Sequence, residues 1–304
     1  MKCRLFSWLL AGMALAGLAT CSGDDEPALK TRRLILTETD NAAARPSSTR
    51  ATLTDGNGLS ASWATGDKLT YCNLSRVDRA NDDAPYYGKL TAQSAAATSL
   101  FTGVVTCNSG DYLAVVYPAT EFETNERYTI ALSGQDGTLE TLASNFHYVY
   151  GRARVTSVTD QTANAEMEKM KSLLTVCKFS FTDAASGSPI PIERLEISYY
   201  GDNNVSYAGK YPQTATVKTT DGNNVIKQQS DVHAEAEKTN LEKSLTVDCT
   251  AAQASVYVAL LPDGERTYNF TVANSEGTYT GTATAQLREG KYVVATGLKL
   301  TKNN

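Results

Sequence analysis

The sequence has few of the side chains on which most enzymes depend. Only two histidines occur among its 304 residues, and the G-x-S-x-G, H-E-x-x-H, P-loop and EF-hand patterns are all absent. His147 lies in an alternating, strand-like run and His233 in a polar loop, so we expect both to be structural or solvated. The acidic pairs at 24–25 and 82–83 lack the alternating ligands of a calcium loop. These gaps predict a protein that is not an enzyme and that holds no metal or cofactor.

Runs of basic charge are missing as well. Beyond Lys2 and Arg4, no run of basic residues is longer than the pair at 32–33. Without Lys2 and Arg4 the chain keeps 26 of its 28 lysines and arginines against 33 acidic residues, a balance of −7. An acidic surface of this kind excludes nucleic acid as a partner, and it excludes a polybasic contact with a membrane.

Long hydrophobic runs are absent except for one near the N-terminus. Residues 5–18 are apolar apart from Ser7 and two glycines, and Lys2 and Arg4 precede or flank them. The run is shorter than the roughly 20 residues of a membrane-spanning helix, and its order is that of a secretory signal. Residues 18–21 resemble the lipobox of bacterial lipoproteins, which implies cleavage after residue 20 and a palmitate-bearing Cys21. The alternative is an ordinary signal peptide that contains a cysteine.

An acidic stretch follows the signal. Residues 22–27 are typical of a solvated tether, and they resemble the sorting signals that send lipoproteins of the Bacteroides group to the outer cell surface. We assign residues 1–20 to a signal peptide and residues 21–50 to a tether and a first strand that is open to removal on maturation. The precursor is therefore expected at the outer membrane, held there by its lipid.

Past residue 30, apolar side chains recur at every second position. Runs of this kind, rich in Val, Thr and Tyr, are 33–37, 68–74, 112–117, 172–181, 195–200, 245–248, 255–261, 268–273, 278–285 and 291–300. Asp-Gly and related turn signals separate them. The pattern predicts an all-β fold of two tandem β-sandwich domains, residues 51–165 and 166–304. The helical signal is thin: residues 163–171, near the boundary, are good helix formers but cover barely two turns.

Four cysteines remain beyond the tether, none of them in a C-x-x-C pair: Cys72, Cys107, Cys177 and Cys249. An exported protein can form disulfides, and pairing Cys72 with Cys107 and Cys177 with Cys249 would keep each bond within one predicted domain. The alternative is that they are small buried apolar residues. Cys177 favours this alternative, because it shares a strand face with Phe179 and Phe181.

The tyrosines are the best candidates for a recognition surface. Tyr199, Tyr200, Tyr207 and Tyr211 lie close together in the sequence. Exposed rings can stack on sugars, which would make this segment a glycan platform. The alternative is a hairpin whose tyrosines face one another across strands, and the same choice applies to Tyr86–Tyr87.

Several short motifs resemble the fimbrillin family, the type V pilins of the Bacteroides group. In that family a basic residue and a short strand precede a W-x-x-G-D-x-[IL] element, as at residues 49–53 and 63–69 here. Further matches stand in the family's order at 114–119, 257–262 and 287–292. The resemblance implies two transthyretin-like β-sandwich domains and assembly with other fimbrial subunits outside the cell. It also implies a contribution to adhesion, with a host or bacterial surface receptor or glycan as a further partner.

The same resemblance implies how the subunits assemble. A lipidated precursor is cut at an arginine, loses its first strand and opens a groove that a strand of the next subunit fills. We place the cut between Arg50 and Ala51. The bond after Arg45 is a poor rival, because trypsin-like enzymes cut poorly before a proline.

A candidate for the donated strand lies at the other end of the chain. Tyr292, Val294, Leu298 and Leu300 recur at even spacing and would share one strand face. The alternative is that residues 291–300 form the last strand of their own domain. Taken together, the sequence predicts a structural subunit of surface fimbriae. The rival is a cell-surface glycan-binding lipoprotein that does not polymerise, and no feature favours a surface hydrolase.

Overall fold

The fold is almost entirely β, as the period-two runs predict. The computed structural model describes residues 30–38, 52–56, 58–79, 86–123, 127–167, 170–201, 208–219 and 243–303. The predicted signal peptide, the lipid position Cys21 and the cut between Arg50 and Ala51 lie outside the described residues, as do Tyr207 and His233. Two tandem β domains follow one another along the chain, which confirms the predicted fold class.

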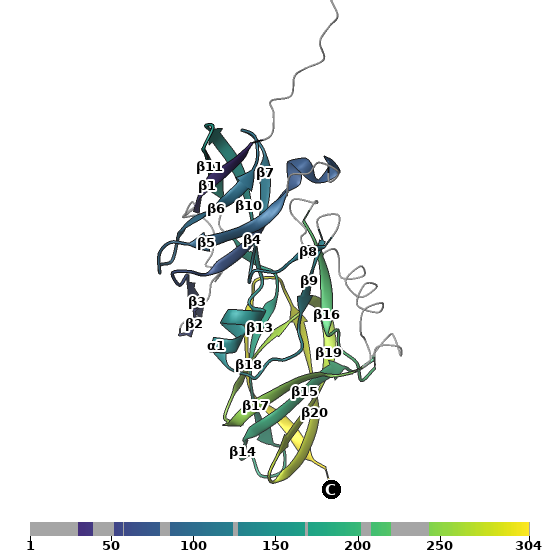
Figure 1. The fold of residues 1–304 in the computed structure, drawn as a ribbon. Coiled ribbons are helices and arrows are strands. Elements are labelled where there is room, and N and C mark those ends of the chain that lie inside the picture. The colour runs from purple at the N-terminus through teal and green to yellow at the C-terminus, as the bar shows by residue number, and fades with distance from the viewer. Residues whose placement is uncertain are drawn as a thin grey trace, which may run out of the picture.

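The first domain is an eight-stranded sheet that curls into a barrel (Figure 1). Its strands are β1 (Thr31–Glu38), β4 (Lys68–Asn73), β5 (Tyr87–Ala92), β6 (Leu100–Thr106), β7 (Tyr112–Tyr117), β10 (Val149–Val158), β11 (Thr162–Met167) and β12 (Lys171–Ser172). They follow the order β11-β1-β6-β5-β4-β7-β10-β12. Because β10 also pairs with β11, the sheet closes on itself and leaves few strand edges open.

The second domain is a sandwich of two layers. Its strands are β13 (Thr175–Asp183), β14 (Pro189–Ile190), β15 (Ile192–Tyr199), β17 (Leu245–Gln253), β18 (Val256–Leu260), β19 (Asp263–Asn274), β20 (Gly277–Leu287) and β21 (Tyr292–Lys302). The strand order is β14-β13-β21-β20-β19-β15-β17, and β18 pairs with β13. The two layers join where β20 meets β21, and there only two residues of each strand pair.

Smaller elements from the first half of the chain pack onto the second domain. They are the hairpin of β2 (Thr52–Asp55) and β3 (Leu59–Ser62), the strands β8 (Phe122–Glu123) and β9 (Arg127–Ala131), the short helix α1 (Leu139–Thr141) and the π-helical turn η2 (Leu142–Phe146). The 3-10 helix η1 (Leu74–Arg79) instead contacts β7 of the barrel, where the N–H of Tyr112 donates to Oγ of Ser75. β16 (Thr214–Lys218) pairs with β9, so a segment of the second half completes this small sheet.

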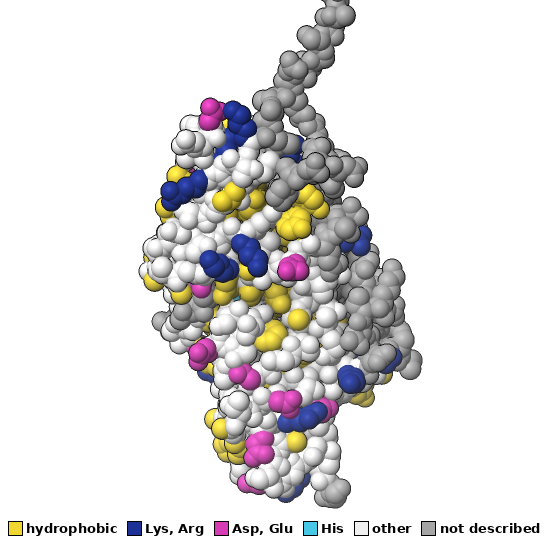
Figure 2. All heavy atoms as spheres, in the orientation of Figure 1, with side chains coloured by type: hydrophobic (Ala, Val, Ile, Leu, Met, Phe, Trp, Pro, Cys, Tyr) yellow, Lys and Arg dark blue, Asp and Glu magenta, His cyan; other side chains and the backbone are white. Residues whose placement is uncertain are grey.

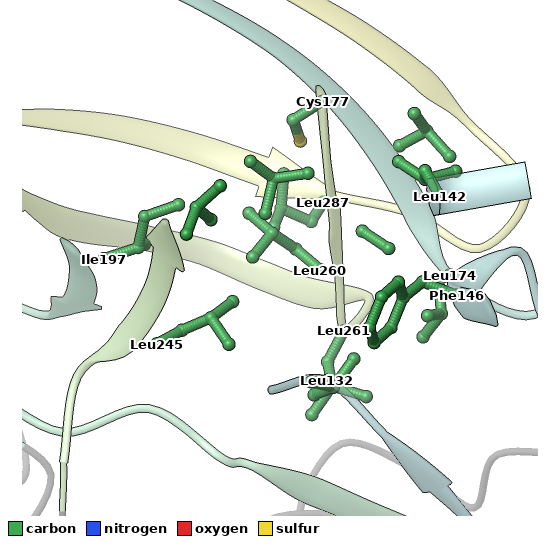
Figure 3. Close-up of a cluster of buried hydrophobic side chains, with 14 of the residues drawn as sticks. Leu132, Leu142, Phe146, Leu174, Cys177, Ile197, Leu245, Leu260, Leu261 and Leu287 are labelled. Atoms are coloured by element: carbon green, nitrogen blue, oxygen red, sulfur yellow. The ribbon is translucent and has the colours of Figure 1, made fainter. Parts of the chain in front are cut away.

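Two hydrophobic cores form, and one wall of the barrel belongs to both. Along β4, Tyr71 lies in the barrel core and Cys72 in the second core. Along β7, Val115 and Val116 divide in the same way. Figure 3 shows side chains from both halves of the chain in the second core, among them Leu132, Phe146, Leu174 and Leu261. The shared wall therefore joins the two domains through apolar packing.

The thin helical signal of residues 163–171 is not realised over residues 162–167, because these form strand β11. Ala163, Ala165 and Met167 alternate into the barrel core and are at most 2% exposed. Helix propensity is worth only fractions of a kcal/mol per residue, so burial on one strand face outweighs it. The predicted domain boundary after residue 165 lies inside β11, and the division into 51–165 and 166–304 stays a prediction.

The suggested disulfides are not formed. Cys107, Cys177 and Cys249 carry free thiols, so neither predicted pair exists. The reason for the first pair is geometric: Cys107 lies in the barrel core, whereas Cys72 lies on the other side of the wall. Burial raises the pKa of the Cys107 thiol to about 11. Cys177 is fully buried among apolar side chains, which is the alternative that the sequence offered.

Candidate assembly site

The strand β1 lies in the interior of the barrel sheet, between β6 and β11. It runs antiparallel to β6 and parallel to β11. Leu34 and Leu36 are 0% exposed, whereas Arg33 and Thr37 face solvent. Burial of the two leucines contributes about 3–6 kcal/mol. Loss of β1 would therefore open an apolar groove between two unpaired strand edges.

A buried arginine fixes one end of β1. Arg32 is 7% exposed, and its Nε donates to the carbonyl oxygen of Thr159 at 2.6 Å. Its Nη1 donates to the carbonyl oxygens of Lys30, at 2.9 Å, and of Cys107. A buried cation is tolerated only when its donors are satisfied, and here backbone carbonyls satisfy them. Two of these carbonyls, those of Thr159 and Cys107, belong to the groove and not to β1.

A buried indole fixes the other end. Trp63 is 1% exposed, and its Nε1 donates to Oε2 of Glu38, the last residue of β1, at 3.2 Å. The ring meets Phe101 and Tyr117 edge to face, with centroids 4.9 and 5.4 Å away. Such aromatic contacts add to the apolar burial and set the position of the indole. Trp63 is thus part of the groove wall that holds the end of β1.

The rest of the W-x-x-G-D element forms the turn that positions Trp63. The backbone N–H of Ala64 donates to Oδ2 of Asp67 at 2.7 Å. Gly66 has a φ of +93°, a left-handed conformation that favours glycine, and its N–H donates to the carbonyl oxygen of Ala92 at 2.9 Å. Burial raises the pKa of Asp67 above its usual value. The motif is therefore a structural device that connects the groove to β5.

At the other end of the chain, β21 is paired within its own domain. It runs parallel to β13, from Val176 opposite Tyr292 to Asp183 opposite Leu300. The pairing shifts by one residue between Phe179 and Phe181, where β21 has a bulge. Here the alternative reading of residues 291–300, as a strand of their own domain, describes the arrangement in this structure.

The bulge also changes which residues of β21 share a face. Gly297 lies in it with a φ of +67°. Val293 and Ala295 pack against the second core before the bulge, and Leu298 and Leu300 do so after it. Val294 is 56% exposed on the opposite side. The predicted row of Tyr292, Val294, Leu298 and Leu300 is therefore not a single face, because one extra residue inverts the alternation.

An ion pair attaches the β2–β3 hairpin to the second domain. Oδ2 of Asp55 accepts from Nζ of Lys178 at 2.6 Å and from the hydroxyl of Tyr257 at 2.8 Å. The hydrogen bond from Lys178, followed by that from Tyr257, holds the pKa of Asp55 below its usual value. The residues that follow the predicted cut site are thus tied to β13 and β18, independently of β1.

The tyrosine cluster belongs mainly to the core. Tyr199 and Tyr211 are 2% and 0% exposed, and their ring centroids lie 5.1 Å apart. Burial raises the pKa of both phenols well above its usual value. Tyr200 is exposed, as is Tyr87, whose ring meets Tyr86 edge to face. These contacts match the hairpin interpretation, and they leave no stack of the clustered rings for a sugar within the described chain.

Sites for other chemistry are not seen in the described residues. No group of three or more His, Cys, Asp or Glu side chains among them could hold a metal ion. His147 is 1% exposed and lies directly after η2, as a structural histidine would. No helix of the described chain is long and apolar enough to cross a membrane. Figure 2 shows acidic and basic side chains scattered over the visible face, without a large patch of one sign.

Comparison with solved structures identifies the class of fold. A protein from Bacteroides ovatus, described as a candidate cell adhesion protein, superimposes with a TM-score of 0.50 at 12% identity, covering 90% of this chain and 96% of that one. A second such protein, from Bacteroides fragilis, has a TM-score of 0.42 at 11% identity and coverages of 90% and 94%. A fimbrial protein from Bacteroides ovatus has a TM-score of 0.38 at 10% identity and coverages of 89% and 49%.

These likenesses concern the fold. The first one shows that the chain shares the fold of that Bacteroides ovatus protein over almost the full length of both. No protein-family model and no curated protein sequence matches the chain.

Sequence reasoning missed two residues that define the groove. Arg32 was noted only as part of a basic pair, and Glu38 was not singled out. The signal that could have found them is the strict alternation of β1, which places both on the same face as Leu34 and Leu36. A charged residue on the buried face of a strand needs a partner, and here Trp63 is the partner of Glu38.

Proposed function

We propose that the protein is a structural subunit of a fibre on the cell surface, contributing to adhesion. In this proposal it is exported as a precursor that carries lipid on Cys21 and is cut between Arg50 and Ala51. The cut releases β1, and a C-terminal strand of the next subunit takes its place. No enzymatic activity is part of the proposal.

The observation that supports it best is the placement of the two terminal strands. β1 lies in the barrel at one pole of the elongated molecule, and the C-terminus lies at the opposite pole (Figure 1). A contact between opposite poles of identical subunits is heterologous, and it builds an open filament when its rotation does not close a ring. The interior position of β1 between β6 and β11 also supports the proposal. Loss of β1 would leave a groove that another strand fills well.

The cut is tested by changing its arginine. We expect Arg50→Gln to abolish fibres at the cell surface, measured by electron microscopy with antibody labelling, while Arg45→Gln leaves them intact. Subunits recovered from wild-type fibres should begin at Ala51 by N-terminal sequencing. Of the two tryptophans, Trp8 leaves with the signal peptide, so the emission of Trp63 should shift to the red when β1 is released. Fibres whose subunits still begin at Cys21 would contradict the cut and favour a different role at the cell surface.

The lipid is tested separately. Cys21→Ala should abolish incorporation of labelled palmitate, because Cys21 alone follows the apolar signal at the lipobox position. Cys3→Ala is the matched control and should incorporate palmitate as the wild type does. Equal labelling of the Cys21→Ala protein would show that the lipid assignment is wrong.

A further inference from the structure

The groove beneath β1 has specific polar requirements at both ends. Without β1, the carbonyl oxygens of Thr159 and Cys107 lose the guanidinium donors of Arg32. At the other end, Nε1 of Trp63 loses its acceptor on Glu38. A buried polar group left without a partner is unfavourable, because it loses its hydrogen bonds to water without gaining others. A good occupant therefore needs a cation, then two apolar side chains at alternate positions, then a hydrogen-bond acceptor.

The strand β21 is divided into two halves by its bulge. Residues 292–295 pair with residues 176–179 of β13, and residues 298–300 pair with 181–183. Gly297 lies between the halves with a φ of +67°, and no atom of the described chain lies within 4 Å of where its Cβ would be. The backbone at Gly297 can therefore turn without a side-chain clash. Glycine can exchange this conformation for an extended one, so residues 296–302 can straighten and leave while residues 292–295 remain in the last strand of their own domain.

Residues 296–302 carry the order of residues that the groove requires, but in reverse. Read backwards from the C-terminal side, every second residue of this segment is Lys302, Leu300, Leu298 and then Thr296. They would take the places of Arg32, Leu34, Leu36 and Glu38, in that order. The Lys302 ammonium would meet the carbonyls of Thr159 and Cys107, and the Thr296 hydroxyl can accept from Trp63.

The same segment read forwards does not fit. With Leu298 and Leu300 in the places of Leu34 and Leu36, Lys302 falls in the place of Glu38. Its ammonium has only donors and would face the N–H of Trp63 in a buried position. Two donors without an acceptor are costly in such a place, so the forward direction is disfavoured.

We propose that the groove of one subunit is filled by residues 296–302 of β21 from a second copy, running in the direction opposite to β1. This inference rests on the proposed function and adds the direction and register of the donated strand. The occupant would run parallel to β6 and antiparallel to β11, whereas β1 has the opposite relation to each. Gly297 is the pivot of the change, because it exchanges its bulged conformation for an extended one and takes the place of Thr37.

The direction is tested with cysteine pairs on the outward face, where a disulfide can form between subunits. Arg33 lies opposite Val104, Ile35 opposite Thr102 and Thr37 opposite Leu100. In the reversed strand, Thr301 takes the place of Arg33 and so lies opposite Val104. In a forward strand, Thr301 takes the place of Thr37 and lies opposite Leu100. Lys299 lies opposite Thr102 in both directions, which makes this pair a control for donation itself.

The experiment compares fibres of three double variants with wild-type fibres on a non-reducing gel. We expect ladders of linked subunits for Thr102→Cys with Lys299→Cys and for Val104→Cys with Thr301→Cys, and none for Leu100→Cys with Thr301→Cys. A ladder from the Leu100 pair, or none from the Val104 pair while the control pair links, would overturn the direction and leave donation standing. Absence of all three ladders would overturn donation by this segment, and the inference with it.

Discussion

The two terminal strands of the described chain resemble each other in pairing and differ in how firmly they are held. β1 runs parallel to β11 and β21 runs parallel to β13, whereas the other pairings between named strands are antiparallel. β1 is paired along both edges, and its inward leucines are fully buried. β21 pairs with β20 at only two residues, carries a bulge and exposes Val294.

This difference fits the separate tasks that we propose for the two strands. A strand whose removal activates a subunit should leave a deep, well-defined groove, as β1 would. Residues 298–300 pair with β13, residues 301–302 pair with β20 and Leu300 is 1% exposed, so the contacts made in the groove of the second copy have to offset the loss of these. Interior strands contribute more to stability than edge strands, because both of their edges and one full face are paired or buried.

The largest expected effect compares matched leucines on the two strands. Leu36→Ala should lower the free energy of unfolding by about 3–5 kcal/mol, because it leaves a cavity in the closed barrel. Leu298→Ala should cost roughly 1–2 kcal/mol, because Leu298 is only partly buried and its site is open to water. Urea unfolding of the two variants, carried out on the uncut protein, measures both values. Equal losses of the free energy of unfolding in the two variants would contradict the difference that we infer between β1 and β21.

The next largest effect concerns the ion pair that attaches the β2–β3 hairpin to β13, the strand that pairs with β21. Asp55→Asn removes the charge that pairs with Lys178 and should lower the free energy of unfolding by about 1–2 kcal/mol. Lys30→Gln is a control, since its pair with Asp160 is exposed and should contribute close to nothing measurable. Thermal unfolding of both variants gives the comparison.

The same ion pair predicts a pH dependence. The folded-state pKa of Asp55 is lowered, so its contribution to stability is present above the usual aspartate pKa of about 3.9. The contribution is lost as the pH falls through the lowered pKa and the carboxylate becomes protonated. The difference between wild type and Asp55→Asn should therefore shrink on acidification below that value. A constant difference from pH 7 to pH 2 would show that the ion pair is not its source.

The smallest expected effect is at the pivot. Gly297→Ala should lower the stability of the second domain by about 1 kcal/mol, because alanine adopts a positive φ only with strain. No contact changes, since the added Cβ meets open space. Thr296→Ala, next to it and exposed, is the control and should be within about 0.5 kcal/mol of the wild type. An unchanged free energy of unfolding in Gly297→Ala would mean that the backbone of the bulge relaxes to accept alanine, and that Gly297 is not required there.

The sequence predicts the strands well because the period-two signal is local. The runs 112–117 and 291–300 correspond to β7 and β21 to within two residues at each end. It also identified Trp63 and its motif as a landmark, although not the hydrogen bond to Glu38. Alternation cannot show that both faces of a strand are buried, each face in a different core. On β4, Tyr71 and Cys72 are both buried, in different cores, and for this reason the suggested Cys72–Cys107 pair failed.

Two other errors arise from tertiary context. The segment 163–167 has the residues of a helix, but its small side chains fit between β1 and β10 in the closed barrel. That closure depends on strands more than a hundred residues apart, which no local window contains. On β21, the even spacing was counted straight through Gly297, where a bulge inverts the alternation. Glycine within a strand was the one available signal for the bulge.

The barrel wall that belongs to both cores links the two domains mechanically. On β10, Val149 packs inside the barrel, while Tyr150 packs in the second core, where its hydroxyl donates to the carbonyl oxygen of Thr219 at 3.5 Å. Bending one domain against the other would pull this wall out of one core. We therefore expect the molecule to resist bending as a single body, so that a fibre of the kind we propose would flex at the joints between its subunits.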